Sequence, residues 1–316
     1  MKRGIRTSFM LAALAAGIAV PALAQELPQE GPVPTTALIN VQSKNAAQID
    51  PRGLTLQVNG HDTPITSLRA AASGNEEIAI LIDDGLRTSF GLQLKEISNF
   101  VNSLPRNAKV LVGYMQNGTV RSSGHFTADH QEIVNQIRMP IGVPGQSASP
   151  YFCLSDFVKS WPSQEPAARF VLMITNGVDP YNGRPSMMNQ DSPYVETAQN
   201  DAARAGVAVY SIYFQNSGFR GGHGSLSGQS YLQQVGDATG GMLFNQGPIT
   251  PVSIGPYLEQ FAHAINSSYE LGFMANASNK RDALVRIRVK SKESGVKVHA
   301  PEAVRPGSAE MAMASR

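Results

Sequence analysis

Two apolar stretches, each about one strand long and each followed directly by polar residues, constrain the fold of this chain more than any other feature. Ile78–Ile82 precedes Asp83–Gly85, and Phe170–Ile174 precedes Thr175–Gly177. A strand that is apolar at every position suits a parallel sheet covered by helices on both faces. Ligands of such sheets bind where the carboxyl ends of neighbouring strands meet. The sequence therefore predicts a doubly wound α/β domain with a candidate site after these two strands.

Strand and helix patterns alternate between residues 76 and 268, which supports a mostly parallel sheet. One pair of strands differs, because residues 109–115 and 119–122 are separated by Asn117 and Gly118, a tight-turn signal that predicts an antiparallel hairpin at the sheet edge. We expect helices over residues 92–104, 129–137, 152–161, 193–205, 231–238 and 256–265, a strand over 207–214 and a glycine-rich loop over 217–228.

Short strand patterns occur at both ends of the chain, over residues 37–41, 54–58, 64–68, 269–274, 284–289 and 296–299. A doubly wound domain usually brings its ends close together. We therefore expect strands within 36–70 and 269–300 to pack as one small β module. The predicted division is 1–24 signal peptide, 25–75 leader and N-terminal strands, 76–268 α/β domain, 269–300 C-terminal strands and 301–316 flexible tail, with 25–35 as a flexible leader.

The first 24 residues have the pattern of a secretory signal peptide. Basic residues at positions 2, 3 and 6 precede the apolar segment Phe9–Val20 and the small-x-small motif Ala22–Ala24. We expect cleavage near Ala24 and a secreted or periplasmic mature protein; an uncleaved membrane anchor is the alternative. No later segment has the roughly 20 consecutive apolar residues of a membrane span.

The charge and cysteine content of the mature chain exclude some function classes. The whole chain has 26 basic and 24 acidic residues, and removal of residues 1–24 takes away three basic residues and no acidic one, which leaves 23 and 24. This near-neutral balance predicts no nucleic-acid partner. Cys153 is the single cysteine, so no intrachain disulfide forms, and its apolar neighbours predict a small buried hydrophobe rather than a nucleophile.

Several short motifs, in this order, resemble the von Willebrand factor type A domain. Phe126–Asp129, Ile174–Gly177 and Thr239–Gly241 are similar to its phenylalanine-threonine helix entry, its threonine-aspartate-glycine turn and its last helix–strand turn. Further segments resemble the secreted bacterial (acidobacterial-type) vWFA-related proteins, namely Asp191–Tyr194, Ala205–Tyr210 and Tyr269–Phe273. The resemblance covers about residues 37–301, and it implies a ligand-binding or adhesion-type module without naming a ligand.

The resemblance also implies where a divalent cation binds in that family, and the matching residues here are degenerate. The family uses an Asp-x-Ser-x-Ser motif, a hydroxyl on a middle loop and a second aspartate. Asp83 matches the first aspartate, Gly85 and Arg87 stand in place of the serines, and Asn176 replaces the second aspartate. Because Mg²⁺ needs about six oxygen ligands near octahedral geometry, we expect no metal.

The middle-loop hydroxyl has two candidates, Ser147 and Ser149. If a divalent cation such as Mg²⁺ binds after all, its ligands are expected to be Asp83, Ser147 and Asn176. The full set of candidate ligand-binding residues is Asp83, Asp84, Arg87, Ser147, Ser149 and Asn176.

Arg87 brings a fixed positive charge into the place of the cation. We expect it to be an internal counter-ion for Asp83 or Asp84, because a planar guanidinium suits a carboxylate. The alternative is that Asp83 and Asp84 only cap the helix that follows them. These two interpretations stay open at the level of sequence.

The chain lacks the motifs that mark catalysis, because its histidines do not have zinc-site spacing and no nucleophile elbow or phosphate loop is present. We expect a non-enzymatic module, without a cofactor, that binds a protein or a cell-envelope polymer through these loops. Tyr181, Met187, Met188 and Tyr194 either contact that partner or cover a helix. The alternatives are an envelope structural or assembly component and a hydrolase of unrecognised type, since a spatial triad leaves no mark on one sequence.

Overall fold

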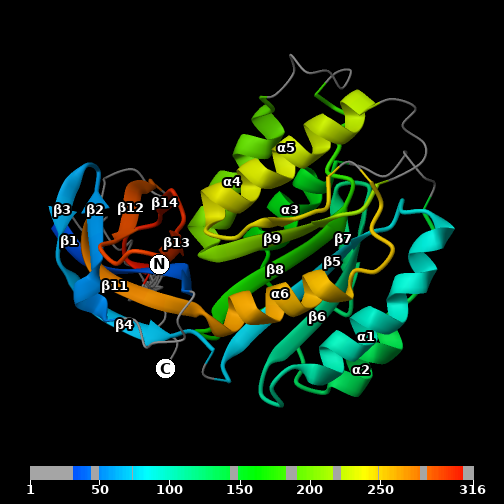
Figure 1. The fold of residues 1–316 in the computed structure, drawn as a ribbon, viewed down its shortest axis with the longest axis horizontal. Helices are drawn as coiled ribbons and strands as arrows, with labels where there is room; N and C mark the ends of the chain where they lie inside the picture. The colour runs from blue at the N-terminus through cyan, green and yellow to red at the C-terminus, as the bar shows by residue number, and fades with distance from the viewer. Residues whose placement is uncertain are drawn as a thin grey trace, which may run out of the picture.

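The computed structural model describes residues 31–43, 50–72, 74–142, 149–182, 191–215, 222–247, 249–277 and 283–308. The expected signal peptide lies outside these residues, as do Ser147, Met187 and Met188. Within the described ranges, no helix is long and apolar enough to cross a membrane. The chain forms an α/β domain with a smaller β module beside it (Figure 1).

The α/β domain is built on a six-stranded sheet with the order β10-β9-β8-β5-β6-β7. Its strands are β5 (Glu76–Asp83), β6 (Lys109–Gln116), β7 (Thr119–Ser122), β8 (Ala168–Thr175), β9 (Val207–Tyr213) and β10 (Leu243–Phe244). All neighbouring pairs are parallel except β6 with β7, which is antiparallel and lies at the edge. The predicted doubly wound sheet with one edge hairpin is confirmed.

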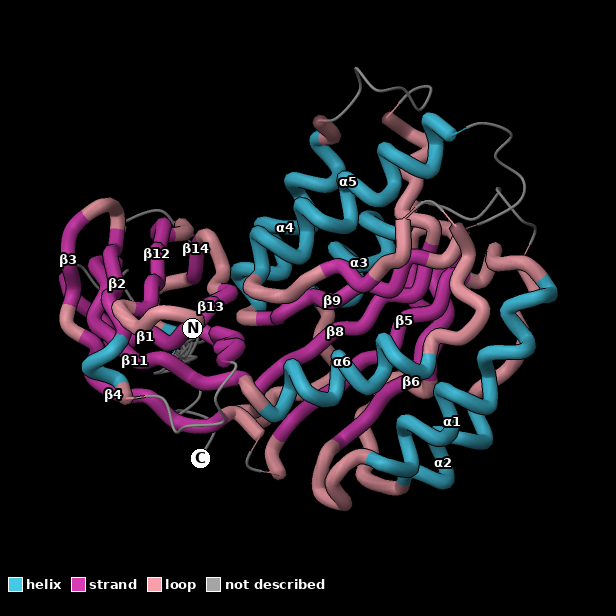
Figure 2. The backbone as a smooth tube through the Cα atoms, viewed as in Figure 1, coloured by secondary structure: helices cyan, strands magenta, loops and turns pink. Residues whose placement is uncertain are grey.

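Helices cover both faces of this sheet (Figure 2). Among the described residues, the α-helices are α1 (Leu94–Ser103), α2 (His130–Gln136), α3 (Pro150–Lys159), α4 (Pro193–Ala205), α5 (Gly222–Thr239) and α6 (Gly255–Asn266), and the short 3₁₀ helices are η1 (Pro51–Gly53) and η2 (Thr88–Gln93). Alternate residues of β5 divide between two cores: Ile78 and Ile80 pack with α1, α2 and α6, whereas Ala79 and Leu81 pack with α3, α4 and α5. This double burial explains why β5 is apolar at successive positions.

The helix boundaries follow capping chemistry where the sequence offers it. Ser192 accepts hydrogen bonds from two backbone N–H groups at the start of α4, and Gly206 ends that helix in the left-handed region at φ 66°. Asp129 caps α2 in the same way. These boundaries agree with the predicted ones.

The glycine-rich loop predicted over 217–228 is wrong for residues 222–228, which belong to α5. Glycine is a poor helix former, but tertiary packing overrides that weak preference here. A Cβ atom on Gly228 would lie 2.2 Å from the carbonyl oxygen of Asn176. The glycine therefore lets α5 approach the loop that follows β8.

The β module contains two four-stranded sheets, with the orders β13-β1-β11-β4 and β14-β12-β2-β3. Its strands are β1 (Gly31–Ser43), β2 (Leu54–Val58), β3 (His61–Thr63), β4 (Ile65–Ala70), β11 (Ser268–Ala277), β12 (Val285–Ser291), β13 (Val296–His299) and β14 (Ala303–Val304). β1 pairs with β11 along its length, so the two ends of the chain share one sheet and one apolar core. The flexible leader predicted over 25–35 is wrong for residues 31–35, which lie in β1.

The flexible tail predicted over 301–316 is wrong for residues 301–308, and 309–316 lie outside the described residues. β14 pairs with β12, and the Ser308 hydroxyl accepts a hydrogen bond from the Thr36 backbone N–H at 2.9 Å. The Gly307 N–H donates to the Thr35 hydroxyl at 3.2 Å. Backbone pairing therefore fixes a segment whose composition resembles a linker.

The β module lies at the amino ends of the main-sheet strands. β4 leads into β5, and α6, which runs against the strand direction, leads directly into β11. Figure 1 shows the module on the left and the loops at the carboxyl ends of the strands on the right. The carboxyl ends are thus left uncovered by the module.

Gly241 precedes the last strand, β10, and lies against Val209 of β9, so that a substitution there tests how β10 joins the sheet. A Cβ atom there would lie 1.9 Å from the Val209 carbonyl oxygen. We expect Gly241→Ala to lower the free energy of unfolding by about 3 kcal/mol in urea denaturation, because β10 must move away from β9. The control is Gly206→Ala, where φ is +66° and no atom lies within 4 Å, so that only about 1 kcal/mol of backbone strain is expected. Equal effects would contradict the packing argument.

Candidate functional site

The carboxyl ends of the two central strands meet at Asp83. This residue ends β5 and Thr175 ends β8, and the Thr175 hydroxyl donates to Asp83 Oδ2 at 2.8 Å. The Gly85 backbone N–H donates to Asp83 Oδ1 at 2.9 Å, and the side chain is buried. Both oxygens of this carboxylate therefore accept hydrogen bonds from the loops that surround them.

Asn176 follows Thr175 and bonds to its own loop. Its Oδ1 accepts from the Val178 backbone N–H at 2.9 Å, and the residue is buried. Gly177 lies next to it at φ 67°, and the Tyr151 hydroxyl of α3 donates to the Gly177 carbonyl oxygen at 2.7 Å. The β8–α4 loop is thus held by α3 from one side and by Gly228 of α5 from the other.

Asp84 has a different counter-ion from the one predicted. Its Oδ1 accepts from the Arg138 guanidinium at 2.8 Å and from the Ile141 backbone N–H at 3.1 Å, although the carboxylate side chain is only 1 % exposed. The Arg138 guanidinium also lies over the Tyr114 ring, 3.7 Å from its centre. The prediction that Arg87 neutralises Asp84 is therefore wrong, because Arg138 after α2 takes that position.

Arg87 itself lies at the start of η2, in the loop between β5 and α1. Its side chain forms no hydrogen bond or ion pair with any residue that the structure describes, and its buried Nε has no hydrogen-bond partner there. The prediction that it pairs with Asp83 is also wrong for the described contacts, since Thr175 and Gly85 hold that carboxylate.

The alternative in which the acidic residues cap the following helix is wrong as well. Neither η2 nor α1 receives a side-chain hydrogen bond at its first turn, and their cap positions are Arg87 and Gln93. Ser149 does act as a cap: it is fully buried and accepts from the Tyr151 backbone N–H of α3 at 3.3 Å. Ser147, the other hydroxyl candidate, lies outside the described residues.

The oxygens that the structure describes do not fit a Mg²⁺ site. No group of three or more His, Cys, Asp or Glu side chains occurs within the described ranges. Asp83 and Asn176 would have to share oxygens that already accept hydrogen bonds, and Ser149 serves α3. Mg²⁺ demands near-ideal octahedral geometry, which this donor set does not provide.

Sequence reasoning missed a buried polar network under the β8–α4 loop. Asp179 is 3 % exposed; it accepts from the Ser192 hydroxyl at 2.9 Å and from the Tyr181 N–H at 3.1 Å. Burial, and next the charge of Asp179, raise the pKa of Tyr151 well above its ordinary value. Only the Asp-x-Tyr spacing before the Ser-Pro helix start hints at this network in the sequence. It ties residues 179–181 to the start of α4.

Tyr181 and Tyr194 both pack on Phe152 of α3, with ring centroids 5.3 Å and 4.7 Å from it. Tyr181 is nevertheless 58 % exposed. The covering role is therefore observed for both rings, and Tyr181 also offers a surface for contact.

Exposed apolar side chains gather around the loops at the carboxyl ends. The large apolar residues exposed in the described part of the chain are Leu92, Met139, Ile141, Tyr181, Leu226, Ile249, Val252 and Met274. All but Met274, which lies in β11, belong to η2, to the start of α5 or to loops that follow main-sheet strands and α2. We call four of them, Leu92, Met139, Ile141 and Val252, the apolar rim.

Contacts between neighbouring residues hold the apolar rim together. Met139 packs so closely on Gly91 that a Cβ atom there would lie 2.3 Å from its sulfur. Buried Gln93 donates to the Val252 carbonyl oxygen at 3.1 Å and accepts from the Ile254 N–H at 3.0 Å. Together with the hydrogen bond from the Ile141 N–H to Asp84, these contacts bring three separate segments next to one another.

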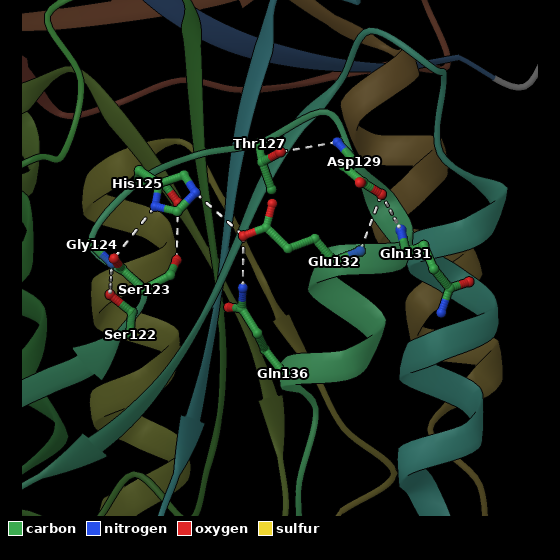
Figure 3. A network of polar contacts seen from close by, with 9 residues as sticks. All are labelled: Ser122, Ser123, Gly124, His125, Thr127, Asp129, Gln131, Glu132 and Gln136. Atoms are coloured by element: carbon green, nitrogen blue, oxygen red, sulfur yellow. Dashed lines mark hydrogen bonds and ion pairs between the residues drawn. The ribbon is translucent and has the colours of Figure 1, made fainter.

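A second polar cluster lies at the start of α2 (Figure 3). His125 Nε2 lies 3.3 Å from Glu132, and its Nδ1 lies 3.4 Å from the Ser123 carbonyl oxygen. The Ser123 hydroxyl donates to the His125 carbonyl oxygen rather than to the imidazole. The described contacts therefore order the β7–α2 loop and do not activate a hydroxyl in the manner of a triad.

A cleft of about 330 Å³ lies beside this cluster, near the amino ends of β5 and β6. Glu77 lines it but is 1 % exposed, and its Oε2 accepts from the Trp161 indole at 2.6 Å and lies 3.8 Å from Arg169. Lys109 pairs with Glu165 at its mouth. Because these charges are paired with each other, the cluster supports the fold at the end of the sheet opposite to the apolar rim.

In comparisons with known proteins, no family model and no curated protein matches the chain. Among solved structures, an aerotolerance-related membrane protein from Bacteroides fragilis aligns with TM-score 0.43 and 15% identity over 60% of this chain and 98% of its own. A von Willebrand factor type A protein from Catenulispora acidiphila aligns with 0.42 and 10% over 92% and 77%. The pilus adhesin SpaC from Lactobacillus rhamnosus gives 0.42 and 8% over 84% and 50%. At these values the alignments assign no function.

Cys153 offers a test of how dry the core beneath the site is. Burial, and next the charge of Asp83, raise the pKa of its thiol to about 12. At pH 8.5 the reactive thiolate should therefore be about a thousandfold rarer than for an ordinary cysteine. We expect iodoacetamide to label the folded protein at least that much more slowly than the urea-unfolded chain. Rapid labelling in native buffer would show that α3 opens readily.

Proposed function

We propose that this protein is a non-enzymatic binding module that recognises a protein partner through the apolar rim. The observation that carries this proposal is that Leu92 is 79 % exposed and Val252 is 96 % exposed on neighbouring loops. Burial of apolar surface stabilises a complex by roughly 25 cal/mol per Å². Contiguous exposed apolar residues mark interaction sites, whereas single ones need no explanation.

The arrangement of the molecule supports this site over others. The β module covers the amino ends of the sheet, and the paired charges around Glu77 lie at that same end. The carboxyl-end loops are instead supported from beneath by Asp84, Gln93 and Asp179. A surface that is apolar outside and hydrogen-bonded inside suits a preformed docking face.

We further propose that recognition needs no metal and that the protein acts outside the cytoplasm. The occupied oxygens of Asp83 and Asn176 support metal independence. The signal-peptide pattern of residues 1–24 supports a secreted or periplasmic location. Of the two alternatives, a structural envelope component predicts a different outcome in photocrosslinking, and a hydrolase of unrecognised type is the other.

Site-specific photocrosslinking tests the docking face. A benzophenone amino acid at position 92 or 252 of the mature protein is expected to capture one partner from envelope extract of the source cells. The same group at position 274, an exposed apolar site in β11 away from the rim, is the matched control. Equal capture at all three positions would indicate non-specific adhesion, and capture only at position 274 would favour assembly through the β module.

Calorimetry tests metal independence. We expect Mg²⁺, Mn²⁺ and Ca²⁺ to bind the mature protein no more tightly than at millimolar concentration, because the described donors do not form an octahedral set. The control is the Asp83→Ala variant, which should give the same weak heats. Micromolar binding that disappears in this variant would contradict the proposal.

A further inference from the structure

Arg87 is a charged side chain of the carboxyl-end loops that no described residue pairs with. A guanidinium has five N–H donors, and buried polar atoms in native proteins are almost always bonded. The Nε of Arg87 is buried and has no partner among the described residues. By contrast, Arg138 is bound to Asp84, to the Met139 carbonyl oxygen and to the Tyr114 ring.

The chain's own carboxylates near Arg87 are already engaged. Thr175 and Gly85 hold Asp83, and Arg138 and the Ile141 N–H hold Asp84. A movement of Arg87 toward either acid would have to displace these bonds. The positive charge of Arg87 is therefore available to a group outside the described chain.

Arg87 lies within the apolar rim. The segment 138–142 contacts the β5–α1 loop on both sides of it: the Gly142 N–H donates to the Asp84 carbonyl oxygen at 2.8 Å, and Met139 packs on Gly91. Leu92 follows in the same 3₁₀ helix. A ligand that binds at Arg87 therefore lies close to the segments that carry Met139, Ile141 and Leu92.

We propose that Arg87 binds a carboxylate of the partner, so that the rim recognises an acidic side chain flanked by apolar ones in a protein segment. The inference rests on the proposed function and names the chemistry of its partner. A planar guanidinium binds a carboxylate through two parallel hydrogen bonds. The apolar neighbours favour a peptide over an acidic polysaccharide, because a sugar acid offers little apolar surface to Met139 and Leu92.

The test mixes the mature protein with one of two peptides that imitate the proposed partner segment. They are acetyl-Leu-Glu-Leu-amide and its glutamine analogue. We expect the glutamate peptide to shift the ¹⁵Nε–H resonance of Arg87 saturably, and the glutamine peptide to bind at least about tenfold more weakly, since a hydrogen bond to a charged group contributes about 1.5–3 kcal/mol. Arg87→Gln should remove this preference for glutamate. Arg87→Lys should keep the charge but lose the fork, and so bind with intermediate affinity.

Arg288→Gln is the matched control, because Arg288 is an exposed arginine of β12 in the β module, at the end of the main sheet opposite to the rim. Its affinity for the glutamate peptide should stay within about twofold of wild type. Thermal unfolding of each variant checks that the fold is intact. The inference is overturned if the two peptides bind equally, if neither shifts the Arg87 resonance, if Arg87→Gln binds like wild type, or if polygalacturonate shifts the Arg87 resonance while the glutamate peptide does not.

Photocrosslinking separates this inference from the proposed function. If capture at position 92 persists in Arg87→Gln with unchanged yield, the rim binds its partner without a carboxylate, and only the inference fails. If capture at position 92 or 252 is absent in wild type, the proposed function fails as well. Capture that falls in Arg87→Gln but not in Arg288→Gln supports both.

Discussion

The parallel pairing of β5 with β8 is the constraint on which the rest of this structure depends. Ile82 lies opposite Ile174 in the register, so that Asp83 and Thr175 end their strands side by side and form a hydrogen bond. A shift of one residue would move every side chain of β5 to the opposite core. The two separate apolar cores fix this register, and the register in turn fixes where the loops of the candidate site begin.

Periodicity and turn chemistry predicted much of this fold because they are local. The apolar run Ile78–Ile82 can only be covered on both faces, and Asn117 with Gly118 permits little besides a tight hairpin. Non-local contacts decided what the sequence could not. Arg138 pairs with Asp84, which lies 54 residues away in the sequence. Gly228 lets α5 pack closely against the loop that follows β8. Residues 301–308 are ordered by a strand partner. None of these long-range contacts produces a local sequence pattern from which it could be predicted.

The two ends of the sheet have different roles because of the order in which the chain connects its helices and strands. α6 must end at the amino side of the sheet, so β11 and the strands that pair with it collect there. Asn40 of β1 donates to the Ala264 carbonyl oxygen at the end of α6 at 2.7 Å and ties the module to the domain. The carboxyl side is then the end at which loops can diverge without disturbing the packing, which is where functional residues of such folds concentrate.

The contrast between two arginines decides what kind of ligand the carboxyl-end loops suit. Arg138 is bound to Asp84 and lies over the Tyr114 ring, and these contacts anchor the segment that carries Met139 and Ile141. Arg87 differs, because its Nε is buried and has no hydrogen-bond partner among the described residues, so that the stem of its side chain lies within the protein surface. An arginine whose stem is fixed loses less side-chain entropy on binding than a freely exposed one. An arginine without a counter-ion among the described residues, beside exposed apolar side chains, is therefore better matched to an anionic group with apolar neighbours than to a cation.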